Sequence, residues 1–145
     1  SIQVPANWTK IGVGDMQALA EFPDAKPFAA LARNWRANIG DANFTMAVLN
    51  TPVTDAVATA KTYATASASE FMDETLLVDG ETGYKMKSND PRTFNPMPAV
   101  FVVHNNSAYI IAGGRVNGDD AWADLEEIIK GWKWAEVEAE AAPAE

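Results

Sequence analysis

The chain has 145 residues and no cysteine, which fits about one domain and excludes disulfides, thiol catalysis and cysteine-ligated zinc. Its 20 acidic and 11 basic residues give a net charge of -9 without a lysine or arginine cluster, which argues against nucleic acids and anionic membranes as partners. No apolar stretch reaches the roughly 20 residues of a membrane-spanning helix, so we expect a soluble protein without membrane insertion.

The first half of the chain predicts one helix and one buried strand. Asp24 and Pro27 suit the start of a helix, and Gly40 suits its end. Between them, apolar residues recur with helical spacing at Phe28, Leu31, Trp35 and Ile39. We therefore expect a helix over residues 27–39 and a strand over residues 43–49.

The middle of the chain predicts a longer helix and then a hairpin. Thr54 is a natural N-cap for a helix that runs to about Met72. The inner face of this helix is expected to be rich in alanine, with Val57, Ala60, Ala64, Ala68 and Phe71. Strands over residues 75–78 and 83–87 flank Asp79-Gly80, which is a strong turn signal.

The last third predicts a second hairpin and a closing helix. Three prolines make residues 88–98 a long irregular excursion. Strand-forming runs over residues 99–103 and 108–112 flank a polar turn, and Gly113-Gly114 is expected to end the second run. A helix should begin after Asp119-Asp120. Its inner stripe would be Ala121, Trp122, Leu125, Ile128, Ile129 and Trp132.

This order of elements predicts an α+β fold, with a largely antiparallel central sheet and helices packed on it. We expect residues 1–134 to form a single domain. Residues 135–145 are rich in alanine and glutamate and show no periodicity, so they are predicted to be a disordered acidic tail.

The same order of residues resembles the PsbP/Mog-type (PsbP-like) superfamily. The matching segments are Val4-Pro5-Ala-Asn-Trp8, the strand from Asn43, Pro52-Val-Thr-Asp55, the hairpin from Val100 to Tyr109, and Gly131-Trp-Lys-Trp134. The resemblance implies an α/β/α sandwich, a mostly non-catalytic role in stabilising or escorting a larger assembly, and an extracytoplasmic location. The helix expected over residues 27–39 departs from this pattern and is interpreted as an insertion.

Few residues suggest catalysis. His104 is the only histidine, which excludes a catalytic histidine pair or a multi-histidine metal site. Its Asn-Asn-Ser neighbours favour a turn residue, with a general base or a single metal ligand as alternatives. Two acidic sets are interpreted as helix-start and surface residues: Asp119, Asp120, Asp124, Glu126 and Glu127, and Asp73, Glu74, Asp79 and Glu81. Binding of a hard cation is the alternative for the first set, and a carboxylate pair for glycoside chemistry is the alternative for the second. No catalytic residue, metal site or cofactor is predicted.

Three functions stay open. The favoured one is a non-catalytic protein-binding or assembly domain of a larger complex. Four residues are expected to contact its protein partner: Trp8, Arg92, Phe94 and Trp134. The alternative is a small-ligand binding protein with a pocket between the helix over residues 27–39 and the sheet. That pocket would be formed by Phe28, Arg33, Trp35 and Tyr84. An enzyme using carboxylate or serine chemistry comes third.

Overall fold

The computed structural model describes residues 4, 6–11, 25–34, 42–66, 69–88, 98–115 and 121–134. These residues form seven strands and two helices. The strands are β1 (Trp8–Ile11), β2 (Ala25–Arg33), β3 (Ala42–Leu49), β4 (Ser69–Val78), β5 (Glu81–Ser88), β6 (Pro98–His104) and β7 (Ser107–Arg115). The helices are α1 (Ala56–Ala66) and α2 (Trp122–Lys130). Neither helix of this described part is long and apolar enough to cross a membrane.

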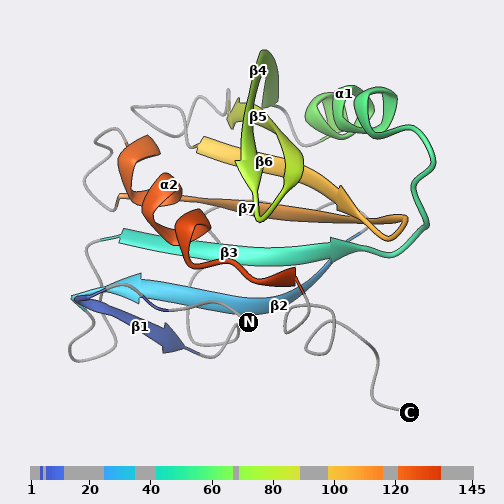
Figure 1. Cartoon of the computed structure of the whole chain (residues 1–145). Helices are drawn as coiled ribbons and strands as arrows, with labels where there is room; N and C mark the ends of the chain where they lie inside the picture. The colour runs from blue at the N-terminus through green and yellow to red at the C-terminus, as the bar shows by residue number, and fades with distance from the viewer. Residues whose placement is uncertain are drawn as a thin grey trace.

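All described strands belong to one antiparallel sheet, in the order β1-β2-β3-β7-β6-β5-β4. Figure 1 shows α2 lying across one face of this sheet, and it shows the β4–β5 hairpin running steeply across the direction of β3 and β7. The strong twist follows from the right-handed twist of each strand, which accumulates toward the end of an open sheet. The result agrees with the predicted α+β class and its largely antiparallel sheet.

Neighbouring side chains of β6 belong to two different layers of the hydrophobic core. Val100 and Val102 belong to one cluster of buried side chains, whereas Ala99 and Phe101 belong to another. Because neighbouring residues of a strand point to opposite faces, the two clusters lie on opposite sides of the sheet. The first contains the buried side chains of α2, and the second contains those of α1. One helix therefore packs on each face.

The α2 side holds the larger of these two clusters. Its fully buried side chains include Leu31, Phe44, Ile111, Leu125 and Trp132, which come from β2, β3, β7, α2 and the segment after α2. Burying one large apolar side chain contributes about 1.5–3 kcal/mol relative to exposure, so this layer supplies most of the hydrophobic stabilisation of the fold.

The predicted helix over residues 27–39 is wrong where the structure describes it. Residues 25–33 form β2, which pairs with β1 and β3, and Trp35 and Ile39 lie outside the described residues. Residues 29–32 are all buried, so β2 is covered on both faces and its apolar residues do not alternate. When apolar residues do not alternate along a strand, some of them can also fall at the i, i+3 and i+7 spacing of a helix. A register shift in the pairing with β3, between Pro27 and Ala29, accommodates the proline in the strand.

Helix α1 is shorter than predicted. It ends at Ala66, and β4 begins at Ser69, so a helix reaching Met72 is wrong. Its cap is also one residue later than expected, because Asp55 Oδ1 accepts a hydrogen bond from the backbone N–H of Ala58 at 3.1 Å. The buried face comprises Ala60, Tyr63 and Ala64, while Val57 is exposed. Pairing with β5 outweighs the helical spacing of the residues that follow α1.

Both predicted hairpins are confirmed, with strands that extend beyond the predicted ranges. Asp79 and Gly80 have φ values of 45° and 90°, the left-handed pair typical of a two-residue type I′ turn. Gly113 does not end β7 as predicted. It faces Phe44 of β3, where a Cβ atom would lie 2.0 Å from the carbonyl oxygen of Asn43. Glycine is therefore required for close approach between β3 and β7 rather than for a turn.

Candidate functional site

The turn end of the β4–β5 hairpin carries a strand edge that no other described strand pairs with. β4 ends the sheet order and, within the described chain, pairs with β5 alone. Residues 75–78 pair regularly with residues 81–84 up to the turn. Within this stretch Leu77 is 69% exposed, more than Val4 and Val57, the other exposed large apolar side chains of the described residues. Residues 75–78 are called the open edge below.

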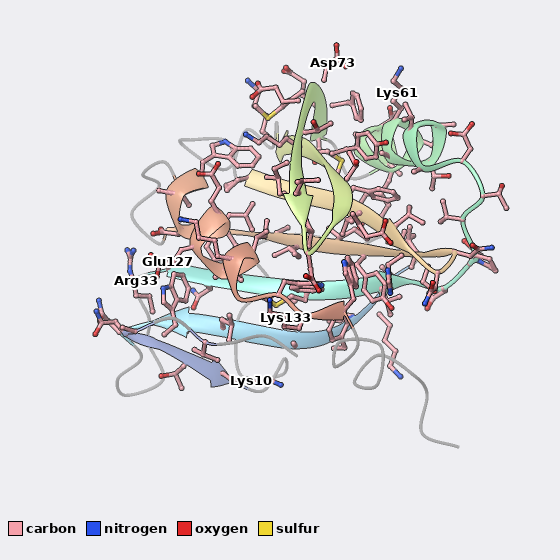
Figure 2. The ribbon with its side chains drawn as sticks, in the orientation of Figure 1. Lys10, Arg33, Lys61, Asp73, Glu127 and Lys133 are labelled. Atoms are coloured by element: carbon pink, nitrogen blue, oxygen red, sulfur yellow. The ribbon has the colours of Figure 1, made fainter. Side chains whose placement is uncertain are left out.

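A bulge separates the open edge from the start of β4. Phe71 pairs with Met86 and Thr75 pairs with Tyr84, so residues 72–74 lie opposite Lys85 alone. Asp73, within this bulge, has a φ of 56° and is exposed. Figure 2 shows its side chain at the outer end of the hairpin, directed away from the sheet. Bulges and charges disfavour edge-to-edge pairing, so β4 is protected there but not along the open edge.

The carboxylates of β4 lie further out than the lysines that face them. Glu74 Oε1 is 3.7 Å from Lys85 Nζ, and Glu70 Oε2 is 3.8 Å from Lys87 Nζ. The Glu74 side chain is 57% exposed against 18% for Lys85, whose Nζ also lies 5.2 Å from the centre of the Trp122 ring. Ion pairs this exposed contribute little to stability. The outermost charge beside the open edge is therefore negative.

Trp134 fixes the other end of the open edge to the body of the domain. Its indole Nε1–H donates to the carbonyl oxygen of Val78 at 2.7 Å, and its backbone N–H donates to Asp79 Oδ2 at 3.1 Å. The segment after α2 thus holds the β4–β5 turn in place. The open edge therefore lies on a hairpin whose turn is held against the rest of the domain by Trp134.

His104 belongs to the same fixed corner. Its Nδ1 atom lies 2.7 Å from Glu81 Oε2, and its ring stacks on Trp134 with centroids 4.4 Å apart and an interplanar angle of 12°. The Tyr109 ring also contacts Trp134, with centroids 5.0 Å apart. His104 is the last residue of β6 and pairs with Ser107 across the turn, close to its predicted position as a turn residue. These contacts give the imidazole a structural role at this corner.

The structure argues against Trp8 and Trp134 as partner contacts. Trp8 is 7% exposed and packs 5.8 Å from Phe44, and Trp134 is 5% exposed. Arg92 and Phe94, the other two predicted contacts, lie outside the described residues.

The predicted ligand pocket is wrong because its parts lie on opposite sides of the sheet. Phe28 packs with the cluster on the α2 side, whereas Tyr84 packs with the cluster on the α1 side. Arg33 is also on the α2 side, and its guanidinium binds Asp124 Oδ1 at 2.8 Å. Trp35 lies outside the described residues.

The described residues contain no group of three or more histidine, aspartate or glutamate side chains placed to hold a metal ion. The open edge was not identified from the sequence, although its residues were correctly assigned to a hairpin. No local signal in the sequence around Leu77 points to it, because strand order depends on contacts far apart in the chain.

Comparisons with known proteins do not assign a family. No protein-family model and no curated protein match the sequence. A protein of Bacteroides thetaiotaomicron with a known crystal structure superposes with a TM-score of 0.49 at 10% identity, over 90% of this chain and 42% of that protein. The chain thus spans less than half of that protein's length.

The solution structure of cyanobacterial PsbP (CyanoP) from Synechocystis sp. PCC 6803 gives a TM-score of 0.43 at 13% identity, over 87% of this chain and 78% of that protein. A PsbP protein is therefore among the structural neighbours of this chain. Superpositions at this level do not establish a common fold, so no property of either protein is transferred.

Proposed function

We propose that this chain is a non-catalytic protein-binding domain, an accessory or assembly module of a larger complex that engages its partner through the open edge of β4. The observation that carries the proposal is Leu77, which is 69% exposed in a regularly paired strand with no described neighbour on its other side. A strand edge of this kind is a template for pairing with another chain, and proteins that do not use it usually cover or charge it.

The engagement of the ionisable side chains in structural contacts supports a non-catalytic role. His104 is paired with Glu81 and covered by Trp134, and the buried carboxylate of Asp124 is bound by Arg33. Asp79, whose carboxylate accepts a backbone N–H, serves the same turn. These are the contacts expected of groups that hold a fold together.

The test is to recover the partner of the tagged full-length chain from an extract of its source cells, by cross-linking and mass spectrometry. Leu77→Lys should lower the recovery of the dominant partner at least about tenfold, equivalent to about 1.4 kcal/mol. Thr82→Lys is the matched control, because Thr82 faces Leu77 across the hairpin but lies on the inner strand. It should leave recovery nearly unchanged.

A third variant separates the open edge from the excursion predicted at residues 88–98. The double change Arg92→Ala with Phe94→Ala should retain the partner if the open edge carries binding. Loss of the partner with this variant, together with full recovery by Leu77→Lys, would move the binding surface to that segment and overturn the assignment to β4.

A further inference from the structure

Resting on the proposed function, we infer that the partner contributes an extended segment with a short apolar centre and basic flanks, which adds to β4 as an extra strand. The backbone, the exposed side chains and the charges around the open edge each favour this occupant.

The backbone of the open edge points outward at alternate residues. A two-residue turn makes Val78 and Glu81 the closing hydrogen-bonded pair of the hairpin. Alternation then makes Leu76 the next residue bonded to β5, whereas Thr75 and Leu77 direct their N–H and C=O groups away from β5. An added strand can bond to these two residues without disturbing the hairpin.

The side chains beside the open edge provide apolar contact on one face. Leu77 and Thr75 lie on the side of the sheet that carries α1, since Thr75 pairs with Tyr84 of that cluster. The rings of Tyr84 and Phe71 stack on that side with their centroids 6.2 Å apart, and both side chains are only partly buried. The central residues of an added strand would lie beside Thr75 and Leu77 on this face, so apolar residues suit its centre.

The charges at both ends of the open edge are negative. Asp73 and Glu74 precede it, and Asp79 and Glu81 follow it. Lys85 and Lys87 are less exposed than the glutamates that they face, and Lys61, whose Nζ lies 5.5 Å from the centre of the Phe71 ring, is the exposed lysine on the α1 side. Lysine or arginine on both sides of the apolar centre would therefore meet carboxylates, an attraction that salt should weaken.

The same charges disfavour a second copy of this chain as the occupant. If two open edges paired in antiparallel fashion about Leu76, Thr75 of each copy would face Leu77 of the other. Asp73 of each copy would then approach Asp79 of the other. Like charges directly opposite each other destabilise strand pairing, so a basic segment of a different protein fits better.

A defined probe tests the inference on the full-length chain labelled with ¹⁵N. The probe is the capped peptide Lys-Arg-Val-Thr-Val-Arg-Lys, followed by NMR and amide hydrogen exchange. At saturation, exchange at Thr75 and Leu77 should slow at least tenfold. Exchange at Leu76 and Val78, whose amides already bond to β5, should change little. Binding should weaken as salt is raised.

Two control peptides separate strand addition from charge attraction. Replacing the central threonine of the peptide by proline keeps its charge but interrupts a strand, and should abolish protection of Leu77. Replacing its basic residues by glutamate should abolish binding altogether. Equal binding of the proline peptide, or binding without protection of Thr75 and Leu77, would overturn strand addition, and so would no binding of the basic peptide.

Chain variants complete the test and distinguish it from the proposed function. Leu77→Pro removes one outward N–H without adding charge and should weaken binding of the peptide at least tenfold. Thr75→Pro removes the other outward N–H and repeats the test if Leu77→Pro does not fold. If Leu77→Lys loses the partner recovered from source cells while Leu77→Pro keeps it, the binding site stands but strand addition is wrong. If both keep that partner, the proposed site itself is wrong.

Discussion

Leu77 and Thr82 face each other across the β4–β5 hairpin, yet only Leu77 lies on the strand that ends the described sheet. Both side chains are exposed. Lysine can therefore be introduced at two exposed positions of one hairpin that differ in distance from the proposed partner.

Neither Leu77→Lys nor Thr82→Lys should change the stability of the isolated domain by more than about 0.5 kcal/mol, because exposed positions away from packed contacts tolerate substitution. Urea unfolding monitored by tryptophan fluorescence measures this. A large loss of stability with Leu77→Lys alone would mean that Leu77 has a structural role, and a loss of partner binding by this variant could then no longer be assigned to the surface.

Gly113→Ala should destabilise the fold more than Gly80→Ala. A Cβ atom at Gly113 would lie 2.0 Å from the carbonyl oxygen of Asn43, so β3 and β7 would have to separate, at a cost on the order of 3 kcal/mol. Gly80 has a φ of 90°, and a Cβ atom added there would meet nothing within 4 Å, so alanine brings only backbone strain of about 1 kcal/mol. Thermal unfolding gives the order, and the reverse order would contradict the close approach of the two strands.

Trp134→Phe should lower the stability by about 1–3 kcal/mol, because it leaves the Val78 carbonyl without its indole donor. It keeps an aromatic ring against His104, so the loss should be smaller than with Trp134→Ala. The local readout is amide exchange at Val78 and Glu81, the pair that closes the hairpin, which should quicken in both variants. Unchanged exchange at this turn would show that Trp134 does not hold it.

Tyr63 predicts how stability depends on alkaline pH. Burial raises the pKa of its phenol above the usual value, because the charged form is poorly solvated between α1 and the sheet. Above a pH of about 10 the unfolded chain releases the Tyr63 proton while the folded chain retains it. The free energy of unfolding therefore falls as the pH rises above that value.

Tyr63→Phe removes this titration. Its free energy of unfolding should fall less steeply between about pH 10 and pH 11 than that of the parent chain, as measured by urea unfolding at each pH. Equal slopes in the two proteins would contradict the shift. Comparing slopes rather than absolute stabilities separates the titration of Tyr63 from its packing against Phe101.

The local parts of the fold were predictable from the sequence. Asp79-Gly80 and Asn105-Asn106 lie in turns whose positive φ values suit these residues, and both hairpins were correctly placed. β2 was assigned to a helix because residues 29–32 are buried on both faces, which removes the alternation that marks a half-buried strand. Capping at Asp55 rather than Thr54 shows how weakly neighbouring polar residues define a helix start.

The open edge could not be predicted because strand order depends on contacts far apart in the sequence. β4 is fourth along the chain but last in the sheet, and nothing local to Leu77 distinguishes an edge strand from a central one. The burial of Trp8 and Trp134 could not be predicted for the same reason. Both tryptophans lie near the ends of the predicted domain, yet both pack into the layer beneath α2.

Amide exchange at Leu77 in the chain bound to its natural partner, compared with the free chain, tests the proposed binding mode most directly. We expect slower exchange at Thr75 and Leu77 in the complex, with little change at Leu76 and Val78. A stable complex in which Thr75 and Leu77 exchange as fast as in the free chain would show that the partner binds elsewhere.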